Sequence, residues 1–181
     1  MQLTTERLIL REYTPGDVPA VLAYQRDESY LRYYPWTKRT EADVREFVQR
    51  FLDWQNEEPR RRFQFAVTLP DSGDLIGSVG IRRKPDNDHE AEIGYELAPE
   101  HWGHGYATEA AGEILDFGFG ELNLHRISAS LVAENSASAR VLERLGMTLE
   151  GRSRHVARFK DRWWDGLTYA ILEHDWRPPE Q

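Results

Sequence analysis

The 181-residue sequence contains no cysteine, so disulfide bonds, thiolate metal sites and cysteine nucleophiles are all excluded. Long apolar runs are missing too, because no stretch approaches the roughly 18 apolar residues that a membrane span requires. The first residues, from Met1 onward, hold no apolar leader segment. We therefore expect a cytoplasmic protein with no membrane partner.

Positive charge is in short supply. The chain has 23 Lys and Arg against 31 Asp and Glu, for a net charge of −8. Such a balance repels phosphate backbones, so we expect no nucleic-acid partner. An acidic surface instead attracts a basic peptide, a polyamine or an aminoglycoside, although net charge does not identify a site.

Length and composition fit one domain, residues 1–181, with its own hydrophobic core. Apolar residues make up 40% and charged residues 30%, which is typical of globular proteins. Internal repeats and low-complexity runs are absent from the sequence. Four histidines lack the helical spacing of a metal site, so no metal is expected: His101, His104, His125 and His155.

Apolar spacing predicts the elements of the first half of the chain. Residues 7–11 are predicted as a strand, and a short helix is predicted through residues 18–22. Thr40 and Asp43 have the spacing of a capping signal before residues 44–52, whose apolar positions recur at helical intervals. This segment is the clearest amphipathic helix of the sequence.

After residue 62 the apolar residues recur at every second position, as they do in a β-strand. Residues 63–69 and 75–82 are predicted to pair as a hairpin, and a third strand places Glu92, Gly94 and Glu96 on one face. Later segments predict a helix after residue 106, a strand around 127–131, a helix from Asn135 to Gly146 and two final strands around residues 160–162. The order implies an α/β fold in which helices cover both faces of a mixed sheet.

Gly103-x-Gly105 lies where the third strand gives way to a helix. Glycines at such a junction let bare backbone approach a ligand, and the first amides of the helix remain free to bind an anion. The dinucleotide fingerprint and the mononucleotide P-loop both need further residues that this segment lacks. A plain turn is the competing interpretation of two glycines. The surrounding residues decide between them.

The segment Trp102-Gly103-His104-Gly105-Tyr106-Ala107 resembles the Gln/Arg-x-x-Gly-x-Gly/Ala signature of the GCN5-related N-acetyltransferase (GNAT) superfamily, with Trp in place of Gln or Arg. Its continuation through Thr108, Glu109 and Ala110 resembles the ribosomal-protein alanine and serine N-terminal acetyltransferases. Residues 5–11, 92–95 and 135–147 also resemble that subfamily, so the likeness spans nearly the whole chain.

The resemblance implies a mostly antiparallel sheet that splays between two parallel strands. It places the pantetheine arm of acetyl-CoA in the gap and brings the acceptor amine from the opposite side. The amine would attack the thioester directly, and coenzyme A would leave as its thiol. Related proteins often form homodimers. The resemblance also assigns coenzyme contacts to Leu97, Trp102, Gly103, His104, Gly105, Tyr106, Ala107, Thr108, Asn135 and Ser138.

Catalytic and acceptor roles are assigned on the same resemblance. Glu92 is the expected base, acting through water, or else an ordinary strand glutamate, and His155 is the reserve candidate for the base. Ser138 is the expected donor to the leaving thiolate, or else a solvated helix serine. Leu142 stands where many members of the superfamily have tyrosine, so the usual phenolic acid is missing. Asn135 equally suits a helix cap, and Glu109 is expected to be structural. The expected acceptor-side residues are Tyr33, Tyr34, Trp36 and His155, with core packing as the alternative for the aromatic ones.

The pKa values of the possible acceptor amines favour one class of acceptor. A lysine amine with a pKa of about 10.4 is almost wholly protonated at pH 7, whereas an α-amine at about 7.7–8.0 loses its proton readily. The modest base candidates therefore favour a protein or peptide N-terminal α-amine. A small amine, such as an aminoglycoside or polyamine, remains an alternative, and so does a catalytically silent module that binds acyl-CoA.

Overall fold

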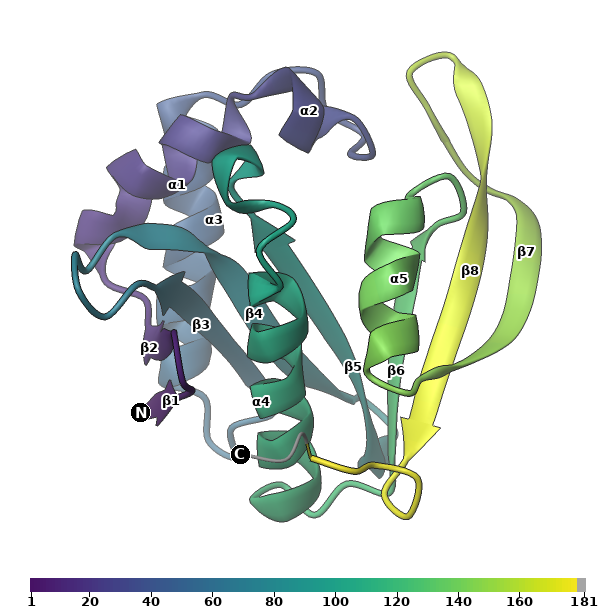
Figure 1. Cartoon of the computed structure of the whole chain (residues 1–181). Helices are drawn as coiled ribbons and strands as arrows, with labels where there is room; N and C mark the ends of the chain where they lie inside the picture. The colour runs from purple at the N-terminus through teal and green to yellow at the C-terminus, as the bar shows by residue number, and fades with distance from the viewer. Residues whose placement is uncertain (179–181) are drawn as a thin grey trace.

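A computed structural model describes residues 1–178 and contains one eight-stranded sheet, in the order β1-β2-β3-β4-β5-β6-β8-β7 (Figure 1). The neighbouring pairs are antiparallel except for β5 and β6. The strands are β1 Gln2–Thr4, β2 Ile9–Glu12, β3 Arg62–Thr68, β4 Leu75–Lys84, β5 Asn87–Leu97, β6 Arg126–Val132, β7 Thr148–Phe159 and β8 Arg162–Leu172.

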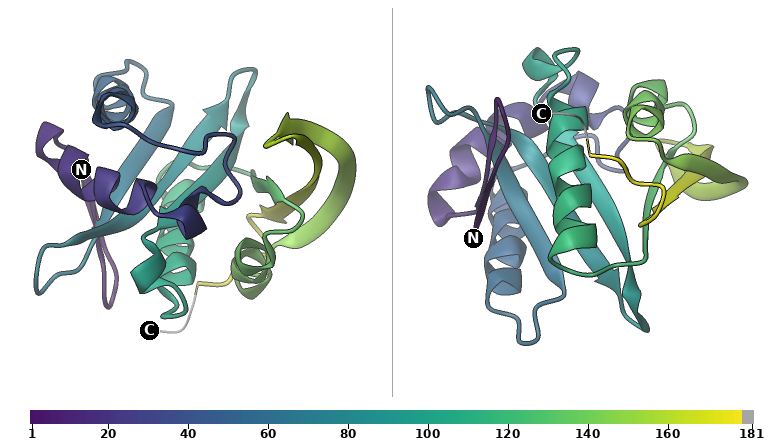
Figure 2. Two further views of the ribbon diagram at one scale, coloured as in Figure 1. Left: turned by 90° about the horizontal axis from the view of Figure 1, so that it is seen from above. Right: turned by 60° about the horizontal axis from the view of Figure 1, so that its bottom comes forward.

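Helices cover both faces of the sheet, as the sequence predicted. The α-helices are α1 Val18–Gln25, α2 Glu28–Leu31, α3 Glu41–Gln55, α4 Tyr106–Gly120 and α5 Ser136–Arg144, and the short 3₁₀ turns are η1 Pro15–Asp17 and η2 Pro99–His101. Figure 2 shows α3 and α4 on opposite faces of the central strands. None of the helices in residues 1–178 is long and apolar enough to cross a membrane.

The predicted capping signal begins α3. Thr40 Oγ1 accepts from the backbone N–H of Asp43 at 3.2 Å, and the Asp43 carboxylate accepts from the Thr40 N–H at 2.7 Å. These reciprocal bonds satisfy two donors that the first turn would otherwise leave without partners. Val44, Val48 and Phe51 then face the sheet, because positions three and four apart share one side of a helix. The predicted amphipathic helix is therefore confirmed.

Two apolar clusters hold the sheet from its two sides. The larger lies between the sheet and α4 and α5, and it includes Phe65, Ile81 and Ile114. The smaller lies between the sheet and α1 to α3, and it includes Val21 and Val48. Each cluster buries apolar side chains against its own face of the strands.

Strands β5 and β6 diverge soon after they meet. They pair only at Glu90 with Arg126, Ala91 with Ile127 and Glu92 with Ser128. Beyond these pairs the sheet divides into a part ending at β5 and a part formed by β6, β8 and β7, with α5 beside the second part (Figure 1). The splay between parallel strands is thus present where the resemblance placed it, and it leaves one edge of β5 without a strand partner.

Candidate active site

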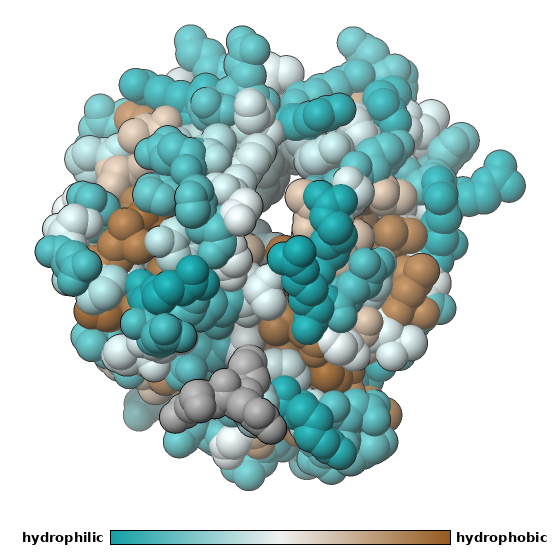
Figure 3. All heavy atoms as spheres, viewed as in Figure 1, coloured by the Kyte–Doolittle hydropathy of each residue, from teal (hydrophilic) through white to brown (hydrophobic). Residues whose placement is uncertain are grey.

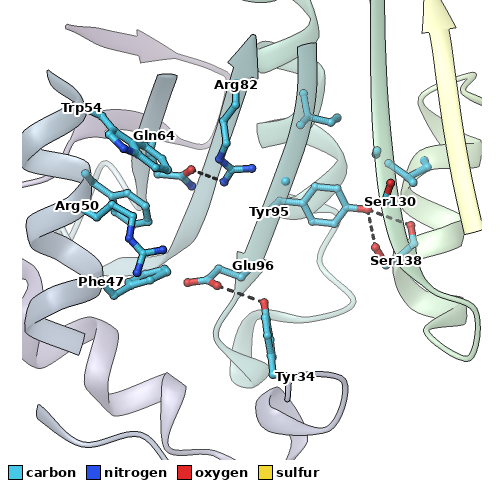
Figure 4. Close-up of a pocket in the computed structure, with 15 residues that line it drawn as sticks. Tyr34, Phe47, Arg50, Trp54, Gln64, Arg82, Tyr95, Glu96, Ser130 and Ser138 are labelled. Atoms are coloured by element: carbon cyan, nitrogen blue, oxygen red, sulfur yellow. Dashed lines mark hydrogen bonds between the residues drawn. The ribbon is translucent and has the colours of Figure 1, made fainter. Parts of the chain in front are cut away.

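The divergence of β5 and β6 leaves a cavity of about 370 Å³. Figure 3 shows the surface hollowed between the two parts of the molecule, and Figure 4 shows the side chains around the cavity. Its walls come from α3, β3, β4, β5, β6 and α5 together with Tyr34. The volume lies in the ordinary range for small-molecule sites. The residues that the later arguments use are Arg50, Arg82, Gly94, Tyr95, Glu96 and Ser138.

Tyr95 crosses the gap from β5 to α5. Its hydroxyl donates to the Ser138 carbonyl at 3.0 Å and lies 2.9 Å from Ser138 Oγ (Figure 4). Burial raises the pKa of Tyr95 to about 12, although the hydrogen bond with Ser138 opposes the rise. The phenol is therefore neutral at pH 7, and it fixes the position of the Ser138 hydroxyl at the cavity wall. Leu142 lies beside them and is fully buried.

Glu96 is the carboxylate that lines the cavity, and sequence reasoning did not select it. It accepts from Tyr24 Oη and Tyr30 Oη at 2.7 Å each, from Gln25 Nε2 at 3.1 Å and from Tyr34 Oη at 3.3 Å. Burial, followed by the charge of Glu96, raises the pKa of the three tyrosines, so all three remain neutral donors. The signals were present in the sequence: Glu96 shares a strand face with Glu92, and tyrosines are dense around residue 30.

Glu92 lies outside the set of residues that line the cavity. It is half-buried on β5, opposite Arg82 on β4 and Ser128 on β6, at the last pair before the strands separate. Because alternate residues of a strand share a face, Glu92 and Glu96 lie on the same side of β5 with Gly94 between them. Glu92 is thus near the narrow end of the opening, and its role as a base stays a prediction.

The glycine junction has left-handed backbone geometry at both of its glycines. Gly103 and Gly105 have φ values of +81° and +83°, a region that residues with a side chain rarely adopt. A Cβ atom at Gly103 would meet nothing within 4 Å, so this side of the loop is open. Gly105 is the N-cap residue of α4 and has no side chain with which to cap the helix. Its first N–H groups therefore point out of the helix without an intrahelical acceptor.

Trp102 and the next residues complete this loop. The Trp102 indole Nε1 donates to the Leu97 carbonyl at 2.9 Å, which ties the loop back to the end of β5. His104 and Tyr106 stack with their ring centroids 5.7 Å apart. An open turn of positive φ at a helix N-terminus, backed by free amides, fits the diphosphate of coenzyme A. The predicted contacts of these residues with the coenzyme stay predictions.

Glu109 and Arg7 form an ion pair that holds the glycine junction in place, which we call the Arg7–Glu109 brace. Glu109 accepts from Thr5 Oγ1 at 2.6 Å, from Arg7 N at 2.9 Å and from Arg7 Nε at 2.7 Å. Arg7 also donates to the His104 carbonyl at 3.1 Å. Burial alone would raise the pKa of Glu109, but these donors lower it below its ordinary value. The structural role expected of Glu109 is confirmed. Besides its favourable position at the start of α4, it joins the helix to Thr5 and Arg7 by hydrogen bonds.

Asn135 caps α5. Its Oδ1 accepts from the backbone N–H of Ser138 at 3.1 Å, which confirms the capping interpretation. The same bond orients the first turn of α5, and with it Ser138. A contact between Asn135 and the pantetheine arm stays a prediction.

The acceptor-side residues separate into different places. Tyr34 lines the cavity, whereas Trp36 stacks on Tyr34 with centroids 5.0 Å apart and lies one layer behind. The Tyr33 hydroxyl donates to the Glu134 carbonyl at 3.0 Å. His155 is exposed on β7, where its ring stacks on Trp163. The structure therefore brings only Tyr34 of this set into the cavity wall.

Residues 7–148 match the acetyltransferase (GNAT) domain family. The chain is 39% identical over 176 residues to the uncharacterized N-acetyltransferase YnaD of Bacillus subtilis, covering 97% of this chain and 99% of that protein. An acetyltransferase of the GNAT family from Bacillus anthracis has a similar structure, with a TM-score of 0.84, 36% identity and coverage of 96% and 99%. The chain belongs to the GNAT acetyltransferase family and is an N-acetyltransferase.

More distant relatives carry names that state an acceptor. The ribosomal-protein-S5-alanine acetyltransferase of Vibrio fischeri has a TM-score of 0.79 and 27% identity, with 98% of this chain and all of that chain covered. The spermidine N(1)-acetyltransferase of Escherichia coli is 24% identical over 167 residues, with coverage of 92% and 87%. The two names point to different acceptor classes.

Proposed function

We propose that this chain transfers the acetyl group of acetyl-CoA to the α-amine of a peptide or protein N-terminus. The observation that carries the proposal is the cavity at the β5–β6 splay, which is lined by α3 from one face of the sheet and by α5 from the other. The two faces allow the two substrates to approach one opening from opposite directions. Acetyl-CoA supplies the activated acetyl group.

The chain's own groups divide the work of binding. Free amides from Gly103 to Thr108 would hold the diphosphate, aided by the positive end of the α4 dipole. The edge of β5 that faces the gap has backbone groups without a strand partner beyond Glu92, so it offers hydrogen bonds to an extended pantetheine arm. Ser138, held by Tyr95 and by the Asn135 cap, would donate a hydrogen bond toward the departing sulfur.

An α-amine suits the modest bases of this site. At pH 7 an amine with a pKa of about 7.7–8.0 needs only about 1–1.4 kcal/mol to lose its proton, against about 4.6 kcal/mol for lysine. A carboxylate that acts through one water molecule suffices for the smaller cost. Glu92 remains the proposed base, and Glu96 is held too firmly by its four donors to move toward a substrate.

A thiol-release assay with matched acceptors tests the proposal. One peptide would have a free N-terminus and no lysine, a second would have a blocked N-terminus and one internal lysine, and spermidine would be the third acceptor. We expect release of coenzyme A with the first peptide and little with the second. Turnover restricted to spermidine would overturn the α-amine assignment. Binding of acetyl-CoA without turnover of any acceptor would indicate a silent module.

A polyamine is the second candidate, favoured by the spermidine-acetylating relative and by the net charge of −8. The local charges of the cavity oppose it. Two arginines, Arg50 and Arg82, line the wall, and a polycation would be repelled by both. Net charge acts over the whole surface, whereas the cavity wall acts on the bound acceptor, so the peptide acceptor is the better supported of the two.

A further inference from the structure

Arg82 is a half-buried arginine without a carboxylate partner in residues 1–178. The one side-chain hydrogen bond that Arg82 makes within the described residues runs from Nη2 to Gln64 Oε1 at 2.8 Å. Gln64 is itself buried and bonded to Ser78. By contrast, Arg7, Arg11 and Arg60 each hold a carboxylate directly. A guanidinium has several more N–H donors than this single bond uses. Arg82 therefore has donors to spare.

The free side of Arg82 faces the opening. Nη1 lies 3.3 Å from the place that a Cβ atom on Gly94 would occupy, so the absence of a side chain at Gly94 leaves the guanidinium uncovered. Both residues line the cavity, and Figure 4 shows Arg82 pointing from β4 toward its interior. Gly94 lies on β5 just past the last pair with β6. Arg82 is thus close to the point where the sheet opens.

The two carboxylates nearest to Arg82, Glu96 in the cavity wall and Glu92 just outside it, form no direct ion pair with this arginine in the part of the chain that the structure describes. The oxygens of Glu96 already accept from four donors, and Glu92 lies across from Arg82 in the strand register. The charges of both carboxylates nevertheless attract Arg82. A second cation, Arg50, lines the cavity from the exposed side of α3 and likewise has no ion pair in the described chain. The α3 side of the cavity therefore presents two guanidinium groups that form no ion pair in residues 1–178.

We propose that Arg82, with Arg50 beside the mouth, forms an anion subsite for the acceptor, and that the acceptor is an amine with a carboxylate a few bonds away. The proposal rests on the proposed N-acetyltransferase activity toward α-amines. A guanidinium fork binds a carboxylate through two parallel hydrogen bonds, which fixes orientation as well as position. A peptide that begins with Asp or Glu has this chemistry, and so does a free α-amino acid.

The position of the subsite separates it from the coenzyme. Arg82 lies on the face of the sheet that α3 covers, where it approaches the Trp54 ring at 5.7 Å. The glycine junction begins α4, on the opposite face. A carboxylate on Arg82 would therefore anchor the acceptor on the α3 side while its amine reaches the gap near Gly94. Removing the arginine would weaken acceptor binding and leave coenzyme binding intact.

Two peptides that differ only in their first residue, Asp or Asn, test the subsite by the ratio of their kcat/KM values. Free aspartate and spermidine are the other arms. We expect the wild-type protein to prefer the Asp peptide by roughly ten- to hundredfold, the range for a hydrogen bond to a charged group. Arg82→Gln would bring the ratio close to one through the KM of the Asp peptide, and Arg82→Lys would restore part of it. Turnover of free aspartate would show that the amino acid alone suffices.

The matched control is Arg45→Gln. Arg45 lies on α3 like Arg50, is exposed, and pairs with Glu41 away from the cavity. It removes the same charge from the same helix, and we expect the Asp-to-Asn ratio to stay at the wild-type value. Arg50→Gln should lower the ratio less than Arg82→Gln, because the exposed guanidinium is screened by solvent.

Equal kcat/KM values for the two peptides in the wild-type protein would overturn the subsite, and so would an equal loss for both in Arg82→Gln, which marks a structural role. A failure of the α-amine assignment itself would appear differently, as thiol release with neither peptide. Calorimetry of each peptide with the protein–coenzyme A complex then still decides the question. Tighter binding of the Asp peptide that depends on Arg82 supports the subsite, and equal binding refutes it.

Discussion

Gly105→Val should separate coenzyme binding from folding. At φ +83° a β-branched side chain is strained, at a cost of about 1–2 kcal/mol for a Cβ in the left-handed region. The new Cβ would also lie 3.4 Å from Arg7 Nη2, within the brace that holds the loop. We expect the melting temperature to fall by roughly 2–8 °C. If two backbone amides no longer donate to the diphosphate, and each hydrogen bond contributes about 1.5–3 kcal/mol, acetyl-CoA affinity falls at least roughly hundredfold.

The matched control is Gly73→Val in the turn between β3 and β4. Gly73 has φ +75°, and its Cβ would meet nothing within 4 Å, so the same backbone strain arises far from the proposed site. Titration calorimetry with acetyl-CoA and with coenzyme A, alongside thermal unfolding, measures both effects. The two variants should lose similar stability, and only Gly105→Val should lose affinity. An unchanged dissociation constant in Gly105→Val would refute the assignment of the diphosphate to this loop.

Further predictions concern the cavity wall and the fold. Ser138→Ala should lower kcat for thiol release while acetyl-CoA affinity stays near wild type. The loss should be roughly tenfold if Ser138 only donates a hydrogen bond and roughly a hundredfold if it is the general acid. An unchanged kcat would show that Ser138 takes no part in the reaction. Tyr95→Phe should lower the free energy of unfolding by about 1 kcal/mol in urea, because it deletes the bonds to Ser138; no change would show that those bonds add nothing. Burial alone would raise the pKa of Asp17, but hydrogen bonds from Arg11 and Thr14 lower it below 3.8. Asp17 therefore stabilises the fold above about pH 4 and loses this effect as the pH falls through its lower, folded-state pKa. The difference in unfolding free energy between wild type and Asp17→Asn should shrink below about pH 4. A difference that stays constant with pH would show that the charge of Asp17 does not stabilise the fold.

Elements with strong local signals could be predicted from the sequence. The capping pair Thr40 and Asp43 fixes the start of α3 within its own turn, and alternation fixes the faces of β3 to β5. Strand β1, with three residues, and α2, with four, are too short to show a period, so both escaped prediction. A cap was visible at Asp27, whose carboxylate accepts from the Ser29 N–H at 2.7 Å and could have marked α2.

Of the candidate site, the sequence could indicate the short glycine turn before α4, but it could not indicate the tertiary contacts of the cavity. Gly103 and Gly105, placed just before a predicted helix, indicate from local sequence a turn that leaves the backbone bare, and both have positive φ values. The tyrosine cage of Glu96 joins groups up to 72 residues apart in sequence, and the Arg7–Glu109 brace joins groups 102 residues apart. Composition can raise the expectation of such contacts, but only the fold selects the partners. For the same reason the sequence could not show that Arg82 forms no ion pair with a carboxylate of residues 1–178.

The opening in the sheet is framed by contacts on several sides, which explains how a divided sheet keeps its shape. At the narrow end, β5 and β6 pair at three positions. Across the middle, Tyr95 reaches Ser138. At the wide end, Lys160 Nζ donates to the Leu31 carbonyl at 2.7 Å, and Tyr33 donates to the Glu134 carbonyl. These contacts join the two parts of the sheet around the gap that Figure 3 shows, and they hold polar groups such as Ser138 in position at its walls.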